Sequence, residues 1–412
     1  MSKRPFVIVC VVACALLSGG AESGLELERS ASVFHSYEFA SVEDTPAPEG
    51  YEPFYISHYG RHGSRRLTGT YISDVIGVLE KGEANGALTV EGRELLADVR
   101  RIAEVHDGMT GELSERGAEE HRALARRMAA RFKGVFASAR MVRCQSSPVS
   151  RVLLSQANFT MALKGEAPAL DFEFATGEKY FRLVCAMHFL QGQNGADEKI
   201  KTEIEKSARS RFDPSRLVRS LFGEAGTDAD AVEFARNLFI VASDCQCIAR
   251  ETRGLDIYRC FEPGEIDALS RILEAEHYAQ MGNSVEFGAA ALAAVGALAE
   301  DFAKRADEAI SGGAVAADLR FGHDSGLWPL AGLIGIDGPG DRAPFACSWE
   351  ACPAWKWMPM AANLQMVFYR DKAGDVLVKV LYNEREMRIN GLSPVQWPYY
   401  RWWDLKERMM KR

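Results

Sequence analysis

A short segment bracketed by glycines, Gly60-Arg61-His62-Gly63-Ser64-Arg65, combines two arginines with one histidine. Planar guanidinium groups and free backbone N–H groups can converge there on a single tetrahedral anion. A neutral imidazole can attack phosphorus and split one difficult displacement into two easier steps, while the arginines stabilise the negative charge of the transition state. The segment therefore predicts a phosphate-binding turn in which His62 is the nucleophile.

Two other interpretations of this segment remain open. It could be an arginine-rich surface turn beside a core histidine, because an Arg-His-Gly sequence alone is not specific. His58 and His62 could also share a metal ion, but that i,i+4 pairing requires a helix, whereas these residues have the pattern of a strand and a turn.

Two later segments carry residues suited to the same chemistry. Arg143 and Arg151 flank residues 144–150, and an arginine at a helix start adds to an anion pocket because the helix N-terminus itself favours negative charge. His323 could donate to a phosphate, and the adjacent Asp324 could protonate a leaving oxygen, as phosphomonoester hydrolysis requires. Either arginine could instead be a solvated surface residue, and a His-Asp pair alone is common.

The elements that must position these residues follow from the pattern of apolar side chains. Strands that end at the three polar segments are expected at 54–59, 139–144 and 315–321. Helices are expected at 91–104, 115–132, 149–161 and 285–310. Ser114 is expected to cap the second of these helices. Near the C-terminus, 364–369 and 376–381 predict a hairpin with Gly374 in its turn.

Strands that alternate with helices predict an α/β fold with a mostly parallel central sheet and helices on both faces. Ligands of such folds bind beyond the carboxyl ends of the strands, where the three polar segments lie. Residues 165–285 have polar helical segments and no convincing strand pattern, so we expect an inserted, mainly helical cap domain there. The α/β core would then comprise residues 25–164 and 286–412.

The composition excludes several classes of protein. The chain has 412 residues, of which 47% are hydrophobic, and this excludes a collagen-like or wholly disordered protein. A formal net charge of −8 argues against nucleic-acid binding as the main role, because such proteins carry an excess of Lys and Arg. The same charge is, at face value, a poor match for a polyanionic ligand.

Residues 1–21 have the order of a secretory signal peptide. Lys3 and Arg4 precede an apolar run that ends at Leu17 and is followed by small residues. The run is shorter than the ~20 residues of a membrane span, so no membrane-spanning segment is expected. A Val-Val-Ala-Cys sequence resembles a bacterial lipoprotein box, and a lipid anchor at Cys14 is therefore an alternative. We expect an exported protein, periplasmic or at the cell surface.

Four segments occur in one order along nearly all of the chain after the signal segment. They are residues 59–65, 111–121, 146–151 and 322–324. Together they resemble the histidine acid phosphatase branch of the histidine phosphatase superfamily, which includes acid phosphatases, phytases and multiple inositol polyphosphate phosphatases. An RHGxR signature with a downstream His-Asp is far more specific than either motif alone. Other parts of the chain resemble exported bacterial members grouped with the inositol phosphatases and phytases.

The resemblance implies a role for each polar residue. His62 would form a phosphohistidine, and Asp324 would be the general acid that protonates the leaving alkoxide. The phosphate would be held by Arg61, Arg65, Arg151 and His323. Arg151 is preferred to Arg143 because the family places this arginine at a helix start, eight residues before an aromatic, which fits Phe159. No metal or other cofactor is implied, and the expected partner is a small-molecule phosphate ester.

The expected function is an exported phosphomonoesterase that acts on inositol phosphates such as phytate. One feature favours a different specificity. The inositol polyphosphate phosphatases typically carry His-Ala-Glu where this chain has His323-Asp324-Ser325, the form usual in acid phosphatases and many phytases. A broad-specificity acid phosphatase is therefore the first alternative. A phosphoester-binding surface protein without turnover is the second, although capture alone does not need Asp324.

Overall fold

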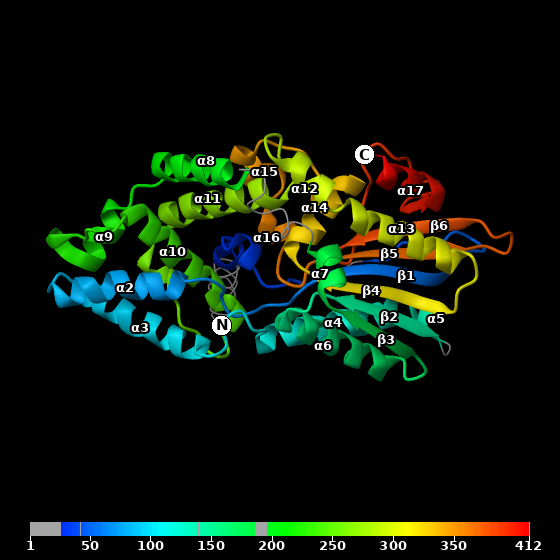
Figure 1. The fold of residues 1–412 in the computed structure, drawn as a ribbon, viewed down its shortest axis with the longest axis horizontal. Coiled ribbons are helices and arrows are strands. Elements are labelled where there is room, and N and C mark those ends of the chain that lie inside the picture. The colour runs from blue at the N-terminus through cyan, green and yellow to red at the C-terminus, as the bar shows by residue number, and fades with distance from the viewer. Residues whose placement is uncertain (1–25, 42, 138–139, 186–195, 412) are drawn as a thin grey trace, which may run out of the picture.

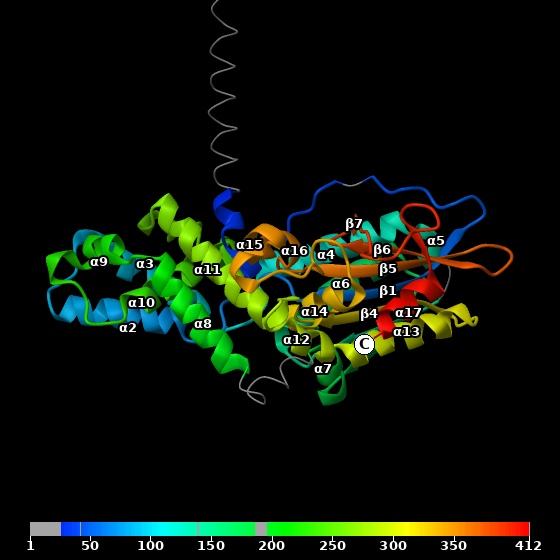
Figure 2. The ribbon, with the colours of Figure 1, turned by 90° about the horizontal axis from the view of Figure 1, so that it is seen from above.

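The computed structural model describes residues 26–41, 43–137, 140–185 and 196–411. The predicted signal segment and Cys14 lie outside these ranges. Figure 1 shows a long molecule with a central sheet at one end and a group of helices at the other. In Figure 2, the segment that leads into the first long strand arches around the outside of the sheet.

A single eight-stranded sheet has the order β3-β2-β4-β1-β5-β6-β7, with β8 paired to β6. The mutually parallel strands are β1 (Glu52–Arg61), β2 (Met141–Ser146), β3 (Asp171–Thr176) and β4 (Val315–Gly322). The strands added in antiparallel pairs are β5 (Asn363–Arg370), β6 (Val376–Tyr382), β7 (Arg385–Glu386) and β8 (Tyr399–Arg401). The α/β class is confirmed, but the prediction of a mostly parallel sheet is wrong because the sheet is mixed.

The C-terminal hairpin accounts for the mixed sheet. Residues 371–375 join β5 to β6, and this turn is far shorter than the crossover of a dozen or more residues that a parallel pair needs. The predicted hairpin is therefore confirmed. β5 also pairs antiparallel with β1, with Asn363 opposite Gly60, so the hairpin extends the sheet instead of forming a separate unit.

Strand β3 lies within residues 165–285, where we expected helices and no strand, and that expectation is wrong. Its sequence, Asp-Phe-Glu-Phe-Ala-Thr, alternates polar and apolar residues over the first four positions only. The strand is an edge of the sheet and pairs with β2. A short edge strand that is largely exposed gives only a weak pattern in a range dominated by helical periodicity.

Helices cover both faces of the sheet, as predicted. Successive side chains of β1 enter two different apolar clusters, because Tyr55 and Tyr59 join one and Ile56 joins the other. The helices of the Ile56 cluster are α4 (Glu115–Arg131) and α6 (Ser150–Glu166). The helices on the opposite face are α13 (Gly296–Ile310) and α17 (Trp402–Met410).

The predicted helices are present with small shifts at their ends. α3 (Val90–His106), α4 and α6 occupy three of the predicted ranges. The predicted cap is confirmed, since the Ser114 hydroxyl accepts a hydrogen bond from the Gly117 N–H at 3.2 Å. The range predicted as one helix at 285–310 contains two, α12 (Gly288–Ala294) and α13, which meet at Val295.

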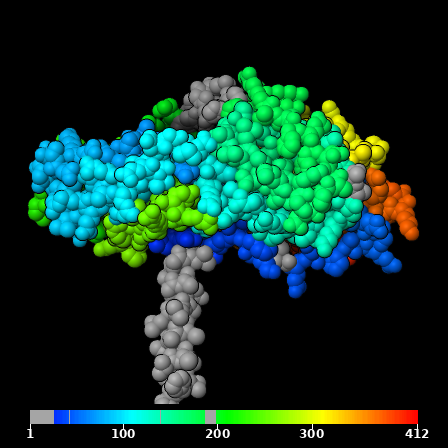
Figure 3. All heavy atoms as spheres, turned by 90° about the horizontal axis from the view of Figure 1, so that it is seen from below, coloured from blue at the N-terminus to red at the C-terminus, as the bar shows by residue number. Residues whose placement is uncertain are grey.

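The group of helices at the far end of the molecule, here called the helical lobe, draws on two parts of the chain. Its members are α2 (Tyr71–Ala84), α3, α8 (Ala196–Arg211), α9 (Ser215–Phe222), α10 (Ala231–Asp244) and α11 (Pro263–Met281). α2 packs against α10, and α3 packs against α9. Figure 3 shows the face on which α2 and α3 adjoin the surface of α4 and α6. Helices from the predicted core range thus join those of the predicted cap, whose boundaries at 165 and 285 stay a prediction.

The remaining helices, most of them short, complete the structure. They are η1 (Ser32–Phe34), α5 (Lys133–Phe136), α7 (Glu178–Val184), η3 (Gly223–Ala225), η4 (Cys245–Ile248), η5 (Tyr258–Cys260), α14 (Asp324–Ile334), η6 (Phe345–Cys347), α15 (Ser348–Ala351) and α16 (Ala354–Trp357). Among the described residues, no helix is both long and apolar enough to cross a membrane.

Candidate active site

The carboxyl ends of β1, β2 and β4 lie side by side. Arg61 is opposite Gly322, and Ser146 is opposite Phe321, so the three parallel strands end in register. Because parallel strands end at one edge of the sheet, the turns that follow them carry the predicted site residues to one place. Those residues are Arg61, His62, Arg65, Arg151, His323 and Asp324.

His62 is buried in a defined orientation. Its Nδ1 lies 3.0 Å from the carbonyl oxygen of Gly63. A carbonyl can only accept, so Nδ1 carries the proton and Nε2 keeps its lone pair. Burial lowers the pKa of His62 well below its usual value, and the positive charges of Arg151 and Arg61 lower it further. The imidazole is therefore neutral over a wide range of pH.

Arg61 is fixed by three partners, and its side chain is only 1% exposed. Its Nη1 donates to the carbonyl oxygens of Val33 at 2.8 Å and Met358 at 2.7 Å. Its Nη2 forms an ion pair of 2.7 Å with Oδ2 of Asp324. The plane of the guanidinium group is thus set by contacts within the protein.

Arg65 and Arg151 are less fully paired. Arg65 donates to the carbonyl oxygen of Arg66 at 3.0 Å, and its guanidinium lies 5.6 Å from the centre of the Phe34 ring. Arg151 lies in the first turn of α6 and reaches the Gly111 carbonyl only at 3.5 Å. Burial, followed by the charge of Arg65, lowers the pKa of Arg151 to about 10. A bound anion would relieve this repulsion between guanidinium groups.

The structure separates the two candidate arginines, of which Arg143 lies within β2 and Arg151 follows it. Arg143 makes two hydrogen bonds of 2.7 Å to Asp318 and one of 2.9 Å to Glu308, so its charge is already neutralised. The Nε atoms of Arg61 and Arg151 are buried and, within the described ranges, have no hydrogen-bond partner. The geometry therefore favours Arg151 over Arg143 as an anion ligand.

His323 and Asp324 complete the cluster at the start of α14. Nε2 of His323 lies 3.1 Å from the Ser147 hydroxyl, and its ring centre is 5.5 Å from that of His62. Burial alone would raise the pKa of Asp324, but Arg61 and His323 outweigh burial, and the pKa is lowered. The arrangement offers one nucleophile, several cationic donors and one carboxyl group around a common point.

Comparison with known proteins addresses the fold. No family model matches this sequence, and no curated protein matches it either. A solved structure of the multiple inositol polyphosphate phosphatase of Bifidobacterium longum with phosphate has a TM-score of 0.77 at 20% identity, over 92% of this chain and 97% of that chain. The phytase of D. castellii has a TM-score of 0.69 at 13% identity, over 93% and 84% of the two chains. This chain has the histidine acid phosphatase fold.

The phytase of Klebsiella sp. ASR1 is a more distant match to the same fold, with a TM-score of 0.54 at 12% identity over 87% of this chain and 95% of that chain. The resemblance stated from the sequence motifs is thus confirmed for the fold. The histidine acid phosphatase fold places the six predicted residues together without fixing their individual roles, which stay predictions.

A cavity of about 580 Å³ opens beside the site in this histidine acid phosphatase fold, among helices of the lobe. Phe34 and His277 line it, and their rings meet edge to face with centres 5.8 Å apart. Of the basic residues in this part of the chain, Lys201 lines the cavity, whereas Arg182 is exposed and paired with Glu178. The cavity adjoins the cluster of predicted site residues, because Phe34 in its wall also contacts Arg65.

Several residues at the site could not be found from the sequence. Phe34 comes from η1 and His277 from α11, and neither lies in a recognisable motif. Gly63 has a steric role, since a Cβ there would lie 2.5 Å from the Gly117 carbonyl oxygen. The motif at 111–121 was the sequence feature that pointed to this region, because it contains Gly117, where α4 contacts the turn.

Within the described ranges, no group of three or more His, Cys, Asp or Glu side chains is arranged to hold a metal ion.

Proposed function

We propose that this protein is a phosphomonoesterase that works through a covalent phosphohistidine at His62. The observation that carries the proposal is the Nδ1 contact with the Gly63 carbonyl, which leaves the nucleophilic Nε2 among buried arginines. The similarity in fold to inositol polyphosphate phosphatases and phytases supports it.

The proposed reaction has two displacements at phosphorus. Nε2 of His62 forms a bond to phosphorus as the ester P–O bond breaks, and Asp324 gives its proton to the leaving alkoxide. Water then attacks the phosphohistidine, Asp324 takes the water proton, and the N–P bond breaks to release phosphate. Arg61, Arg65, Arg151 and His323 hold the phosphate throughout.

A general acid must carry a proton, but the pKa of Asp324 is lowered in the free protein, and the charge of the substrate offsets this shift. The pKa is lowered mainly because Arg61 faces Asp324 across 2.7 Å, although burial opposes this. A bound phosphate would share Arg61 and add negative charge nearby, and both changes raise the pKa of the carboxyl group. Substrate binding thus converts Asp324 into an effective acid.

We favour inositol phosphates, including phytate, as the substrate class because the structural relatives are named for them. The helical lobe, as a cap over the site, would hold the part of the ester beyond the phosphate. The protein would act after export, in the periplasm or at the cell surface, with a lipid anchor at Cys14 as an alternative. Mass analysis of the mature N-terminus distinguishes the two forms.

A broad-specificity acid phosphatase is the second candidate, and the charges of the cavity favour it. Of the bases in its wall, Arg236 is paired with Glu276 at 2.7 Å, and Arg209 is paired with Asp230. Glu198, Glu205 and Glu233 also line the cavity. This wall has no excess of positive charge to bind a highly phosphorylated ring.

The test uses His62→Ala and a panel of phytate, sugar phosphates, nucleotides and phosphotyrosine, with release of phosphate as the readout. We expect the variant to be inactive on every ester, and the wild type to form an acid-labile phosphoenzyme in rapid-quench experiments. Hydrolysis of p-nitrophenyl phosphate by folded His62→Ala at the wild-type rate would refute the mechanism. Tight phosphate binding by the wild type without any turnover would support the binding-protein alternative.

A further inference from the structure

The first turns of α4 hold the turn that carries His62. The backbone N–H and the hydroxyl of Ser114 both donate to the Ser64 carbonyl oxygen, each at 3.0 Å. A Cβ at Gly117 would lie 2.1 Å from that same oxygen, so this helix approaches the turn as closely as glycine allows. The segment 111–121 therefore supports the turn after β1 through these contacts.

Glu120 of α4 binds the backbone N–H and the hydroxyl of Ser64, whereas Ser114 binds the carbonyl of the same residue. Its Oε2 accepts the Ser64 backbone N–H at 2.7 Å, and its Oε1 accepts the Ser64 hydroxyl at 2.7 Å. Oε1 also accepts the backbone N–H of Tyr37 at 3.1 Å. All three partners are donors, so a carboxylate satisfies every one of them.

One peptide group joins this carboxylate to the nucleophile. The N–H that Glu120 accepts and the carbonyl that His62 contacts belong to the same unit, which links Gly63 to Ser64. In a trans peptide these two groups point in opposite directions. A hydrogen bond at the N–H therefore turns the carbonyl toward Nδ1 of His62, and bonds in such a chain strengthen one another.

We infer that Glu120 is a positioning residue, which fixes the orientation and tautomer of His62 through the Gly63–Ser64 peptide. The negative carboxylate polarises the peptide, and the polarised carbonyl keeps the proton of His62 on Nδ1. Nε2 is then the nitrogen that faces phosphorus. The inference rests on the proposed function, because it assigns Glu120 to the nucleophile of that reaction.

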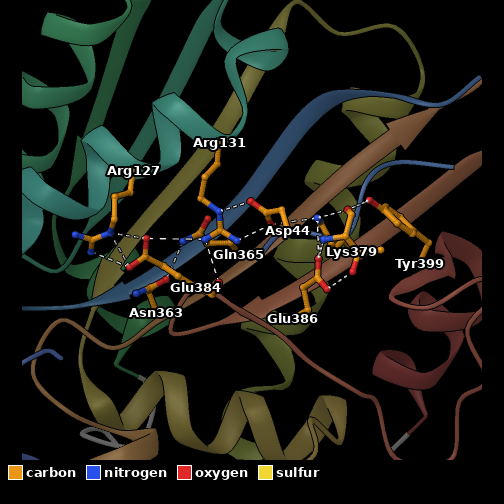
Figure 4. A network of polar contacts seen from close by, with 10 residues as sticks. Asp44, Arg127, Arg131, Asn363, Gln365, Lys379, Glu384, Glu386 and Tyr399 are labelled. Carbon is orange, nitrogen blue, oxygen red and sulfur yellow. Dashed lines mark hydrogen bonds and ion pairs between the residues drawn. The ribbon is translucent and has the colours of Figure 1, made fainter. Parts of the chain in front are cut away.

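A buried network holds Glu120 and Tyr37 in place. The Tyr37 hydroxyl donates to Oε2 of Glu384 at 3.0 Å, and Glu384 accepts hydrogen bonds of 2.8 and 2.7 Å from Arg127. Figure 4 shows Glu384 beside Arg127 and Asn363, in polar contacts that continue through Arg131 and Asp44 to Lys379. The arm that precedes β1 is thus tied to α4 and to the sheet, and its Tyr37 N–H fixes one oxygen of Glu120.

Replacement of Glu120 by glutamine tests the inference. An amide has one accepting oxygen, so one side of the former carboxylate would present an NH₂ group to another donor. The Gly63–Ser64 peptide would lose its defined orientation. Glu119→Gln is the matched control, because this neighbour is exposed and pairs at the surface with Arg250.

Two readouts separate positioning from simple packing. Nitrogen NMR of ¹⁵N-histidine-labelled protein reports which ring nitrogen of His62 is protonated, with the signal assigned by its loss in His62→Asn. We expect Glu120→Gln to lose the Nδ1–H tautomer and to lower kcat on p-nitrophenyl phosphate by about 10- to 100-fold. KM and the affinity for inorganic phosphate should stay near wild type, because Arg61 and Arg151 keep their contacts.

Several outcomes would overturn the inference. These are a wild type with the proton on Nε2, a folded Glu120→Gln variant that keeps the Nδ1–H tautomer, or an altered tautomer with unchanged kcat. Where Glu120→Gln fails to fold, Glu120→Asp takes its place with the same two readouts, because the shorter carboxylate withdraws from the Ser64 N–H. The NMR readout needs no turnover, so an inactive wild type would refute the proposed function without deciding this point.

Discussion

Replacement of Asp324 by asparagine isolates the proposed general acid from the phosphate-binding groups. The asparagine side chain has nearly the same shape, and its carbonyl oxygen can still accept from Arg61, which lies 2.7 Å from Oδ2 in the wild type. Its NH₂ group then replaces Oδ1, which accepts the Ser325 N–H at 2.8 Å in the wild type, so this one hydrogen bond is lost. The variant therefore loses its transferable proton and one backbone hydrogen bond, but keeps the contact with Arg61.

The size of the effect depends on the leaving group. General acid catalysis contributes about 10²- to 10⁴-fold, which corresponds to ~3 to 5 kcal/mol of activation free energy. An alkyl phosphate needs this proton because an alkoxide is a poor leaving group. p-Nitrophenolate is a stable anion that leaves without a proton, so we expect a much smaller loss of kcat with p-nitrophenyl phosphate.

The assay compares kcat and KM of wild type and Asp324→Asn on glycerol phosphate and p-nitrophenyl phosphate. KM should change little for either ester, because the arginines still hold the phosphate. Thermal unfolding of both proteins controls for stability. Equal losses of kcat on the two esters would refute the reasoning and remove Asp324 from the role of acid.

Three further predictions concern the same site. Arg151→Ala should raise KM for p-nitrophenyl phosphate at least tenfold, the effect of losing ~1.4 kcal/mol of charge-assisted binding. Arg143→Ala should lower the melting temperature and leave KM unchanged. Steady-state kinetics in which Arg143→Ala raises KM and Arg151→Ala does not would contradict this assignment. Gly63→Ala should fail to accumulate as folded protein, measured by circular dichroism, because a Cβ there lies 2.5 Å from a carbonyl oxygen of α4. Activity on alkyl phosphates should rise as pH falls. Burial raises the pKa of Asp324, but Arg61 and His323 outweigh burial and lower it, so this acid gains its proton only at low pH, whereas the pKa of His62 lies well below its usual value and the imidazole stays neutral there. Profiles of kcat/KM that rise toward alkaline pH would contradict this prediction.

Much of the site could be predicted because it depends on short segments that follow strands. The strand patterns at 54–59 and 315–321 were strong, and parallel strands end at one edge, so His62 and His323 had to meet. The helical pattern placed Arg151 at the start of a helix, but the preference for it over Arg143 came from the resemblance to histidine acid phosphatases. Local patterns and one topological rule brought the strand ends together, and the resemblance assigned the residues.

The missed features depend on tertiary contacts. Glu120 is one acidic residue in a helix full of charges, and only the fold brings it within 2.7 Å of the Ser64 N–H. Phe34 reaches the site from η1, which has no periodicity to detect. β3 has six residues at a sheet edge, where burial is too small to produce a clear alternation. In each case the partner lies far away in sequence, and one sequence contains no record of that contact.

The acidic net charge does not oppose phosphate binding, because distance decides which charges matter. A unit charge 4 Å from a partly buried partner contributes ~4 kcal/mol at an effective dielectric constant of 20, whereas exposed charges beyond ~8 Å are largely screened at physiological salt. Arg61, Arg65 and Arg151 lie close enough together to lower the pKa of Arg151 to about 10, although burial is the larger cause. They set the sign of the potential at the proposed phosphate site. In the neighbouring cavity Arg236 is already paired with Glu276, so further phosphates meet no comparable field. The site should therefore bind one phosphate tightly and select among esters mainly by the shape of the cavity.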